Sequence, residues 1–423
     1  MLRQEGASPE HSGMKVFFSV GEPSGDLHGA NLIRALRERY PDIECVGYGG
    51  PKMAAAGCRL HFDLTALAVM WFLRVLLNYH KFRRLVRDAA NYFREQKPDA
   101  VVLIDYPGFN WHIARAAKEA GIPVVYYGVP QLWAWGSWRI KKMRRFVDHV
   151  LCKLPFEADW YGERGCKAVF VGHPYYDELA AQRPDPELIE QLSQGPDRLI
   201  GILPGSRTQE VISNLPWFVR AAGHIARQAS DVRFAVASFN ESQAELARQI
   251  LKREQRRLPE NTRIEVLVGK TPEILRAAHS CLACSGSVSL ELLYHCKPAV
   301  VLYYISRSAM RVQSWFRRAR YITLVNLLAA EDRFMDRHEL YDPDSPDAAP
   351  VPFPEYLTCE DRARDMAAHV VGWLQDEGRY QEKRAELHRI LREFGDTGAS
   401  QRAADYLVQE VLPHPARVVR RAA

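Results

Sequence analysis

Short apolar runs alternate with helical stretches along most of this chain, and this alternation limits the folds that are open to it. The runs expected as strands lie at residues 15–20, 100–104, 124–127, 147–152, 168–171, 199–203, 234–237, 264–268, 281–283 and 299–303. Continuous hydrophobic strands that alternate with helices are typical of a parallel sheet covered by helices on both faces. The chain is therefore expected to fold as an α/β protein.

The pattern begins twice, which divides the chain into two similar halves. The run at 15–20 leads into turn residues and a helix, and the run at 199–203 leads into Pro204-Gly205-Ser206-Arg207 and a helix. At about 150 residues per domain, 423 residues fit two Rossmann-like domains with additional helices. The expected boundaries are 14–180 for the first domain, 198–357 for the second and 358–423 for the helices.

The composition of the chain and its apolar runs indicate the cellular compartment in which the protein is expected. The hydrophobic share of 47% and the charged share of 26% are those of an ordinary folded protein. No apolar run reaches about 18 residues, so a transmembrane helix is not expected. Residues 1–13 lack the apolar core of a secretory signal, so the expected location is the cytoplasm.

The cysteines and the basic residues leave more than one interpretation open. The eight cysteines are expected as free thiols, and the pair Cys281 and Cys284 lacks the further ligands that a zinc site needs, so no metal is expected. The net charge is +6, and basic residues gather at 81–87, 139–145 and 311–320. Such clusters form a solvated helix face, or they bind nucleic acid, phosphorylated substrates or anionic lipid.

Two loops in the second half suit a nucleotide diphosphate. Gly205-Ser206-Arg207 and Ser285-Gly286-Ser287 each follow an expected strand and precede a helix. The N-terminus of a helix favours an anion, and arginine matches the geometry of phosphate. Glu291 lies one turn into the second of these helices, where a carboxylate can accept hydrogen bonds from a ribose. Either loop alone is equally well a turn with an N-cap, and neither contains a P-loop or a GxGxxG motif.

The first half offers a different kind of site. Asp105 follows directly on the expected strand that ends at Ile104, and a strand end is a common place for a general base. Its alternative role is an Asx-turn or N-cap before the next helix. The facing loop has residues that could orient an acceptor hydroxyl or its phosphate, namely Glu22, Ser24, Gly25 and Asp26.

Residues 66–77 read ALAVMWFLRVLL, and Arg74 is their only polar residue. The segment is too short to cross a bilayer. It is either a buried core helix or a segment that lies in a membrane interface or holds acyl chains. The side chains expected to reach lipid in the second case are Val69, Met70, Trp71, Phe72, Leu73 and Leu76.

A series of short motifs runs from about residue 15 to residue 357. They are Gly21-Glu22-Pro23-Ser24-Gly25-Asp26, Gly49-Gly50-Pro51-Lys52-Met53, Asp105-Tyr106-Pro107-Gly108-Phe109-Asn110, Trp133-Ala134-Trp135, Pro155-Phe156-Glu157, Val171-Gly172-His173-Pro174, Leu203-Pro204-Gly205-Ser206-Arg207, Ser285-Gly286-Ser287 with Leu290-Glu291, and Asn326-Leu327-Leu328. In this order and spacing they resemble the lipid-A-disaccharide synthases, the membrane-associated glycosyltransferases of the lipopolysaccharide pathway.

The resemblance implies a GT-B glycosyltransferase without a metal or other cofactor. Its two parallel sheets would face a central cleft, and its final helices would cross back to the first domain. The enzyme would join UDP-2,3-diacylglucosamine to 2,3-diacylglucosamine 1-phosphate, releasing UDP and forming a β-1,6 disaccharide 1-phosphate. Asp105 would be the base, Arg207 and the two loops would hold UDP, and Asn326 would lie on the donor side. Members of the family are peripheral membrane proteins and some form dimers, which implies a cytoplasmic protein on the inner membrane and leaves a homodimer open.

The chain departs from the family pattern in four places. Pro23 replaces an alanine, and Val325 replaces the proline before Asn-Leu-Leu. The run at 330–352 is longer than the corresponding loop, and Thr358 stands where a glutamine is usual. The last two departures affect the expected substrate-side geometry more than the expected reaction.

Two other functions compete with this interpretation. Another UDP-sugar-dependent GT-B transferase or a UDP-GlcNAc epimerase would share the UDP loops but would not need a lipid-binding segment at 66–77. A basic nucleic-acid-binding protein would explain the clusters of Lys and Arg, but Asp105 and the Gly-Ser loops would then have no role. No nucleic-acid partner is therefore expected, and salt-dependent retention on RNA would contradict this.

Overall fold

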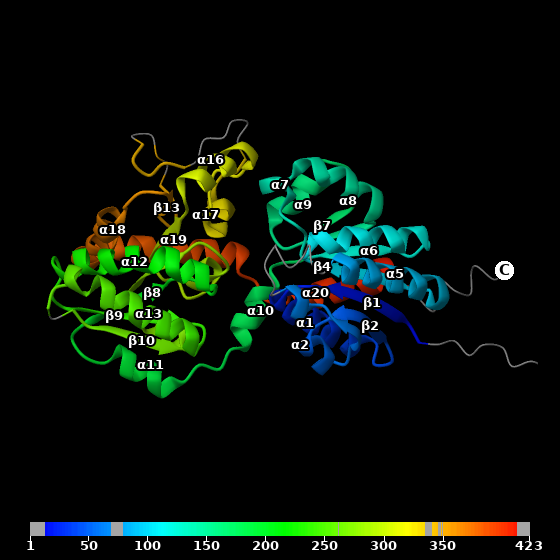
Figure 1. Cartoon of the computed structure of the whole chain (residues 1–423), viewed down its shortest axis with the longest axis horizontal. Coiled ribbons are helices and arrows are strands. Elements are labelled where there is room, and N and C mark those ends of the chain that lie inside the picture. Colours follow the sequence, from blue (N-terminus) through cyan, green and yellow to red (C-terminus); the bar gives the residue numbers. More distant parts are fainter. Residues whose placement is uncertain are drawn as a thin grey trace, which may run out of the picture. The chain divides into compact units, whose positions relative to one another are not determined.

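The computed structural model describes residues 13–68, 79–260, 262–334, 341–345, 348 and 350–412. Contacts between residues divide the chain into two compact units. The first unit contains the described residues up to Leu132, Gly136–Asp177 and those from Thr397 onward, and the second contains Trp133–Trp135 and Glu178–Asp396. Each unit has its own sheet with helices on both sides (Figure 1).

The described strands of the first unit form a seven-stranded parallel sheet in the order β3-β2-β1-β4-β5-β6-β7. The strands are β1 (Lys15–Val20), β2 (Glu44–Gly49), β3 (Arg59–Asp63), β4 (Ala100–Ile104), β5 (Val124–Tyr127), β6 (His149–Cys152) and β7 (Ala168–Phe170). The helices are α1 (Pro23–Arg39), α2 (Pro51–Ala55), α3 (Thr65–Ala68), α5 (Tyr79–Gln96), α6 (Pro107–Glu119), η1 (Ser137–Arg139), α8 (Ile140–Phe146), α9 (Pro155–Gly162), α20 (Ala399–Tyr406) and η3 (Leu407–Val411). Helix α7 (Leu132–Trp135) belongs to the second unit except for Leu132, and α10 (Pro174–Ala181) passes from the first unit to the second after Asp177.

The second unit repeats this arrangement with six described parallel strands in the order β10-β9-β8-β11-β12-β13. The strands are β8 (Arg198–Leu203), β9 (Val232–Ser238), β10 (Ile264–Val268), β11 (Ser280–Cys284), β12 (Ala299–Tyr304) and β13 (Glu355–Thr358). The helices are α11 (Pro186–Ser193), α12 (Thr208–Ala226), α13 (Glu241–Glu254), η2 (Gln255–Arg257), α14 (Thr271–Ala277), α15 (Val288–Tyr294), α16 (Arg307–Phe316), α17 (Leu324–Ala329), α18 (Ala363–Gln375) and α19 (Glu377–Phe394).

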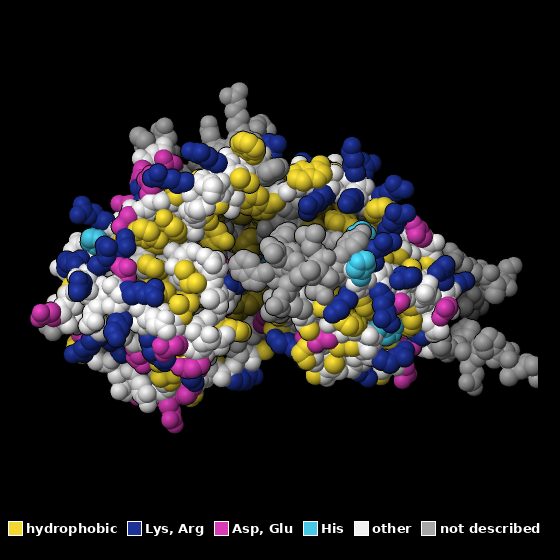
Figure 2. Space-filling view, in the orientation of Figure 1, with side chains coloured by type: hydrophobic (Ala, Val, Ile, Leu, Met, Phe, Trp, Pro, Cys, Tyr) yellow, Lys and Arg dark blue, Asp and Glu magenta, His cyan; other side chains and the backbone are white. Residues whose placement is uncertain are grey.

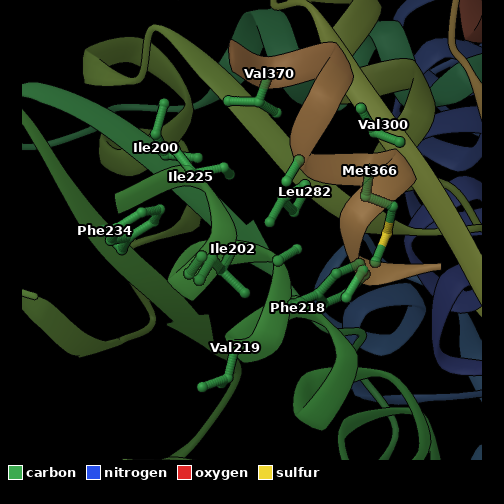
Figure 3. Packing of buried hydrophobic residues seen from close by; sticks show 14 of the residues in the cluster. Ile200, Ile202, Phe218, Val219, Ile225, Phe234, Leu282, Val300, Met366 and Val370 are labelled. Carbon is green, nitrogen blue, oxygen red and sulfur yellow. The ribbon is translucent and has the colours of Figure 1, made fainter. Parts of the chain in front are cut away.

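A continuous hydrophobic core holds the second unit together. Ile202 of β8 and Leu282 of β11 contribute to it from the sheet, and Phe218 of α12 and Met366 of α18 contribute from the helices (Figure 3). These four side chains are fully buried. Burying a side chain of this size contributes roughly 1.5–3 kcal/mol to folding, so α18 is an integral part of this unit.

The end of the chain is divided between the two units. Helices α18 and α19 belong to the second unit, whereas residues from Thr397 onward belong to the first. There α20 packs on α1, and the carboxylate of Asp177 accepts hydrogen bonds from the N–H groups of Gly398 (2.5 Å) and Ser400 (3.0 Å). The residues that join the first unit therefore begin well after position 358, where the helical tail was expected to start.

The parallel α/β architecture expected from the sequence is confirmed in both units. The structure adds three strands that the apolar runs did not indicate, namely β2, β3 and β13. Strand β2 contains Gly47 with φ +134°, and a Cβ atom there would lie 2.1 Å from the carbonyl oxygen of Phe18 in β1. Position 47 therefore requires glycine, which weakens the strand signal of β2.

Candidate active site

Both sheets have a switch point at which consecutive strands are added on opposite sides. In the first unit this point lies between β1 and β4, and in the second it lies between β8 and β11. Ligands of open α/β sheets bind outside the carboxyl ends of the strands at such a point. The loops after β1 and β4 contain Glu22 and Asp105, and the loops after β8 and β11 contain Arg207 and Ser287. The residues that the sequence singled out thus flank the two switch points.

The turn after β4 is strained. Asp105 and Tyr106 have φ values of 44° and 45°, in the left-handed region that non-glycine residues rarely adopt. Each such residue costs of order 1–3 kcal/mol, so neighbouring groups must hold it in place. The backbone carbonyl of Asp105 accepts hydrogen bonds from Tyr126 Oη (2.7 Å) and Asn110 Nδ2 (2.8 Å).

The groups that hold this turn are themselves fixed by buried contacts. Ser19 Oγ donates to Asn110 Oδ1 at 2.7 Å, and both side chains are fully buried. The ring of Tyr106 lies over Gly21, where a Cβ atom would approach Tyr106 Cδ1 to 2.2 Å. The loop after β1 therefore needs a glycine, and the backbone that carries the Asp105 carboxylate is rigidly positioned.

Lys153 is a functional candidate that the sequence analysis did not include. It follows β6, and its Nζ lies 3.3 Å from Oδ1 of Asp105. The two side chains are 17% and 22% exposed, so the ion pair is largely shielded from water. Burial acts to lower the pKa of Lys153, but the charges of Asp105 and Glu157 outweigh it and raise this pKa. An ammonium group therefore accompanies the Asp105 carboxylate.

Two histidines lie near this pair. The rings of His28 and His173 are 6.5 Å apart between centroids. Burial, together with the charges of Lys153 and His28, holds the pKa of His173 well below its usual value. Because Nδ1 of His173 accepts a hydrogen bond from the Tyr175 N–H at 3.2 Å, the neutral ring carries its proton on Nε2. A neutral donor is thus available in the first unit.

The residues expected to orient an acceptor differ in how exposed they are. Glu22 is half-buried and Ser24 is exposed, whereas Gly25 is buried against Val20, whose Cγ1 would lie 2.9 Å from an added Cβ. Asp26 is buried, and its carboxylate accepts from the N–H groups of Gly50 (2.9 Å), Lys52 (2.9 Å) and Met53 (3.1 Å). Asp26 therefore caps α2, and its expected place in the acceptor loop stays a prediction.

The loop after β8 leaves its arginine exposed. Gly205 has φ +120°, and an added Cβ would lie 2.5 Å from Glu210 Oε2. Glu210 accepts the backbone N–H of Arg207 at 3.1 Å and lies 3.3 Å from its guanidinium group. The carbonyl of Ser206 accepts from Gln243 Nε2 at 2.6 Å. The Arg207 side chain itself is 78% exposed, so the loop is fixed while its cation can reach an anionic ligand.

The loop after β11 is open in a similar way. Gly286 and Ser287 are exposed, and an added Cβ at Gly286 would have no atom within 4 Å. Ser285 Oγ instead donates to the carbonyl oxygen of Ile322 at 2.8 Å. Glu291 is half-buried on α15. The N–H groups around Gly286 and Ser287 can therefore approach a ligand, whereas the Ser285 hydroxyl fixes the loop.

Asn326 lies inside the second unit and has a structural role. It is 1% exposed, and its Nδ2 donates to Phe353 O (2.7 Å) and to Glu355 Oε2 (2.8 Å). Its Oδ1 accepts the N–H of Phe353 at 2.9 Å. Both ends of the amide are therefore occupied within the protein, and Asn326 ties α17 to β13. Its expected place on the donor side stays a prediction.

Glu355 completes this buried cluster and links folding to pH. It accepts the N–H groups of Ile322 (2.8 Å) and Thr323 (3.0 Å), and burial raises its pKa from 4.5 to about 7. Between these two values the folded protein binds more protons than the unfolded chain, so stability falls as the pH rises. This pKa difference corresponds to roughly 3 kcal/mol of folding stability, at 1.36 kcal/mol per pKa unit.

We therefore expect Glu355→Gln to flatten the pH dependence of the free energy of unfolding between about pH 5 and pH 7. Urea titrations of both proteins at a series of pH values would measure this. Parallel curves for the two proteins would show that Glu355 remains ionised in the folded state.

Residues 69–78 lie outside the described part of the chain. They include the side chains expected to reach lipid, Val69, Met70, Trp71, Phe72, Leu73 and Leu76. Among the described residues, no helix is long and apolar enough to cross a membrane.

Comparison with known proteins identifies the family. The family model described as "Lipid-A-disaccharide synthetase" matches residues 16–337. The chain belongs to this family. It is 34% identical over 321 residues to the lipid-A-disaccharide synthase of Coxiella burnetii, with 76% of this chain and 83% of the relative covered. It is 32% identical over 408 residues to that of Myxococcus xanthus, with 96% and 99% covered. The protein is therefore a glycosyltransferase.

Solved structures agree with a GT-B fold for this lipid-A-disaccharide synthase family member. The UDP-GlcNAc 2-epimerase of Neisseria meningitidis, bound to UDP-GlcNAc, has a TM-score of 0.59 at 12% identity and covers 94% of this chain and 100% of its own. The calicheamicin glycosyltransferase CalG4 has a TM-score of 0.52 at 14% identity, with 94% and 99% covered. At these identities the likeness concerns the fold alone.

Three of the departures from the family pattern fit their surroundings. Pro23 is exposed in the first turn of α1, where a proline lacks no needed N–H. Val325 is fully buried in α17. Thr358 is buried at the end of β13, and its Oγ1 accepts the N–H of Glu360 at 2.9 Å, which stabilises the turn toward α18. The long run at 330–352 is described only in part.

Proposed function

We propose that the protein transfers 2,3-diacylglucosamine from UDP to the 6-hydroxyl of 2,3-diacylglucosamine 1-phosphate, giving the β-1,6 disaccharide 1-phosphate and UDP. Family membership over most of the chain is the observation that carries this proposal. The loops at the two switch points support it, because a sugar transfer needs a base for the acceptor and charge stabilisation for the leaving diphosphate.

We assign activation of the hydroxyl to the first unit. Asp105 accepts the proton of the acceptor hydroxyl while its oxygen attacks C1 of the donor and the bond from C1 to the diphosphate oxygen breaks. Lys153, 3.3 Å away, fixes the position of the carboxylate. The strained backbone supports this role, because strain at a functional turn persists only where surrounding hydrogen bonds hold it. Glu22 and Ser24 orient the acceptor.

We assign donor binding to the second unit. Arg207, with the N–H groups at the start of α12, stabilises the charge that develops on the leaving diphosphate. Gly205, Ser206, Gly286 and Ser287 supply backbone contacts, and Glu291 accepts hydrogen bonds from the ribose. No metal is needed in this scheme, since an arginine and helix N-termini provide the positive charge.

The deciding experiment follows both substrates by mass. Purified protein is incubated in EDTA with UDP-2,3-diacylglucosamine, with and without the monosaccharide 1-phosphate. The proposal requires the disaccharide 1-phosphate and UDP only when both substrates are present. Isomerisation of the donor sugar without an acceptor would instead favour an epimerase, and activity that returns only with added magnesium would overturn the metal-free scheme.

We also propose that the protein acts on the cytoplasmic side of the inner membrane, as a peripheral protein that residues 69–76 attach to lipid. The segment is aromatic and apolar and precedes a basic cluster at 81–87, which suits a lipid interface. The homodimer that the resemblance leaves open belongs to the same proposal, and sedimentation equilibrium of the purified protein tests it.

If residues 69–76 lie in lipid, Trp71→Ser with Phe72→Ser should lower vesicle binding while the melting temperature changes little. Each large apolar side chain contributes roughly 1.5–3 kcal/mol when it leaves water. Vesicle sedimentation and thermal unfolding of the double variant measure the two quantities. A large loss of stability with unchanged vesicle binding would place the segment in a core instead.

A further inference from the structure

Helix α16 lies on the surface of the second unit and exposes two large apolar side chains. None of the side chains described for it, at residues 307–315, is buried. Val312 is 57% exposed and Trp315 is 74% exposed. The helix is nevertheless well defined at its start, where Ser306 Oγ accepts the N–H of Ala309 at 3.2 Å. Val312 and Trp315 therefore do not contribute to the core of this unit.

A helix of this kind needs a surface to pack on. Isolated helices shorter than about 12–15 residues are marginal in water, and most gain stability by packing an apolar stripe. Residues 312 and 315 are one turn apart, so Val312 and Trp315 form a continuous apolar ridge. The length of α16 and the exposure of this ridge indicate an additional partner.

The charges beside the ridge indicate what that partner is. Arg307, Arg311 and Arg318 are exposed, and no ion pair involves their guanidinium groups within the described part of the chain. The sequence from residue 292 to residue 330 contains neither Asp nor Glu. Hydrophobic and basic side chains reach the surface beside each other at the α16 end of the second unit (Figure 2). Such a surface is complementary to an apolar layer that carries negative charge.

We propose that α16 docks on an anionic lipid bilayer. Val312 and Trp315 enter the boundary between headgroups and acyl chains, and Arg307 and Arg311 bind lipid phosphates. A second copy of this chain fits less well, because two α16 surfaces facing each other would bring their arginines together. The proposal goes beyond the transfer reaction, since it assigns a lipid contact to the second unit through residues far in sequence from 69–76.

The test uses the full-length protein and vesicles without substrate, so its outcome does not depend on the proposed reaction. Val312→Ser with Trp315→Ser should weaken binding to vesicles of phosphatidylcholine and phosphatidylglycerol by about 10-fold or more. Arg307→Gln and Arg311→Gln should each weaken it by about 5-fold and reduce the preference over pure phosphatidylcholine. High salt should have the same effect as the arginine variants.

Matched controls separate docking from other effects. Phe239 is 71% exposed on the second unit and beside Glu241, so Phe239→Ser should leave vesicle binding unchanged. Melting temperatures should stay near that of the unmodified protein for all these variants, because none replaces a buried side chain. Unchanged vesicle binding in the Val312/Trp315 double variant would overturn the proposal. So would loss of a dimer in that variant without lipid, since a second copy would then cover the ridge.

Discussion

Asp105→Asn should lower turnover by about 10²–10⁴-fold, because asparagine keeps the size of the side chain but cannot accept the proton. Binding of UDP should remain, since that role is assigned to the second unit. The strained turn should also remain, because Tyr126 and Asn110 bind the backbone carbonyl of residue 105 and not its carboxylate. Steady-state kinetics and UDP titration of the variant measure both effects.

A second aspartate of the same sheet provides the control. Asp148 also pairs with a lysine, Lys118, at 2.7 Å. It precedes β6 and so lies at the amino ends of the strands, whereas Asp105 lies at their carboxyl ends. Asp148→Asn should therefore leave turnover close to that of the unmodified protein. A folded Asp105→Asn variant with unchanged turnover would remove Asp105 from the mechanism.

Arg207→Ala should lower kcat/KM by roughly 10²–10³-fold, the usual cost of removing one group that stabilises developing negative charge. The side chain is 78% exposed and lies 3.3 Å from Glu210, so its loss should have little effect on the melting temperature. Arg207→Lys should restore only part of the activity, because lysine keeps the charge but not the paired hydrogen bonds.

Arg263 is the matched control for this variant. It is 76% exposed and pairs with Asp197 at 3.2 Å. It precedes β10 and so lies at the amino ends of the strands, whereas Arg207 follows the carboxyl end of β8. Arg263→Ala should leave kcat/KM unchanged. If Arg207→Ala behaves in the same way, the charge of the leaving diphosphate is stabilised elsewhere.

The periodicity of the sequence was sufficient to predict the strands that lie buried inside the two sheets. Strands β4 and β12 are continuous apolar runs, and they occur where the runs predicted them. Strand β3 was missed because it is an edge strand whose side chains are at least partly exposed. Strand β13 was missed because it has only four residues and follows Pro354. Local patterns thus predict strands that are continuous apolar runs, and they miss strands that glycine or polar residues interrupt.

The motifs were likewise sufficient to locate Asp105, Arg207 and the Gly-Ser loops at strand ends, since a strand followed by a turn and a helix is a local pattern. The environment of these residues was not predictable in this way. Lys153 is 48 positions from Asp105 in the sequence, and only the adjacent ends of strands β4, β5 and β6 bring them together.

The same distinction explains Asp26 and Asn326. Both have side chains that can bind a ligand, and both belong to motifs of the family. Their sequence context does not show that the N–H groups of Gly50, Lys52 and Met53 surround one of them, or that Phe353 and Glu355 occupy the other. The sequence by itself determined the α/β class, the family and the strand-end positions of the site, because these follow from local patterns. The tertiary structure alone decided which polar side chains are consumed by buried hydrogen bonds, because a buried N–H or C=O must find a partner wherever the fold places one.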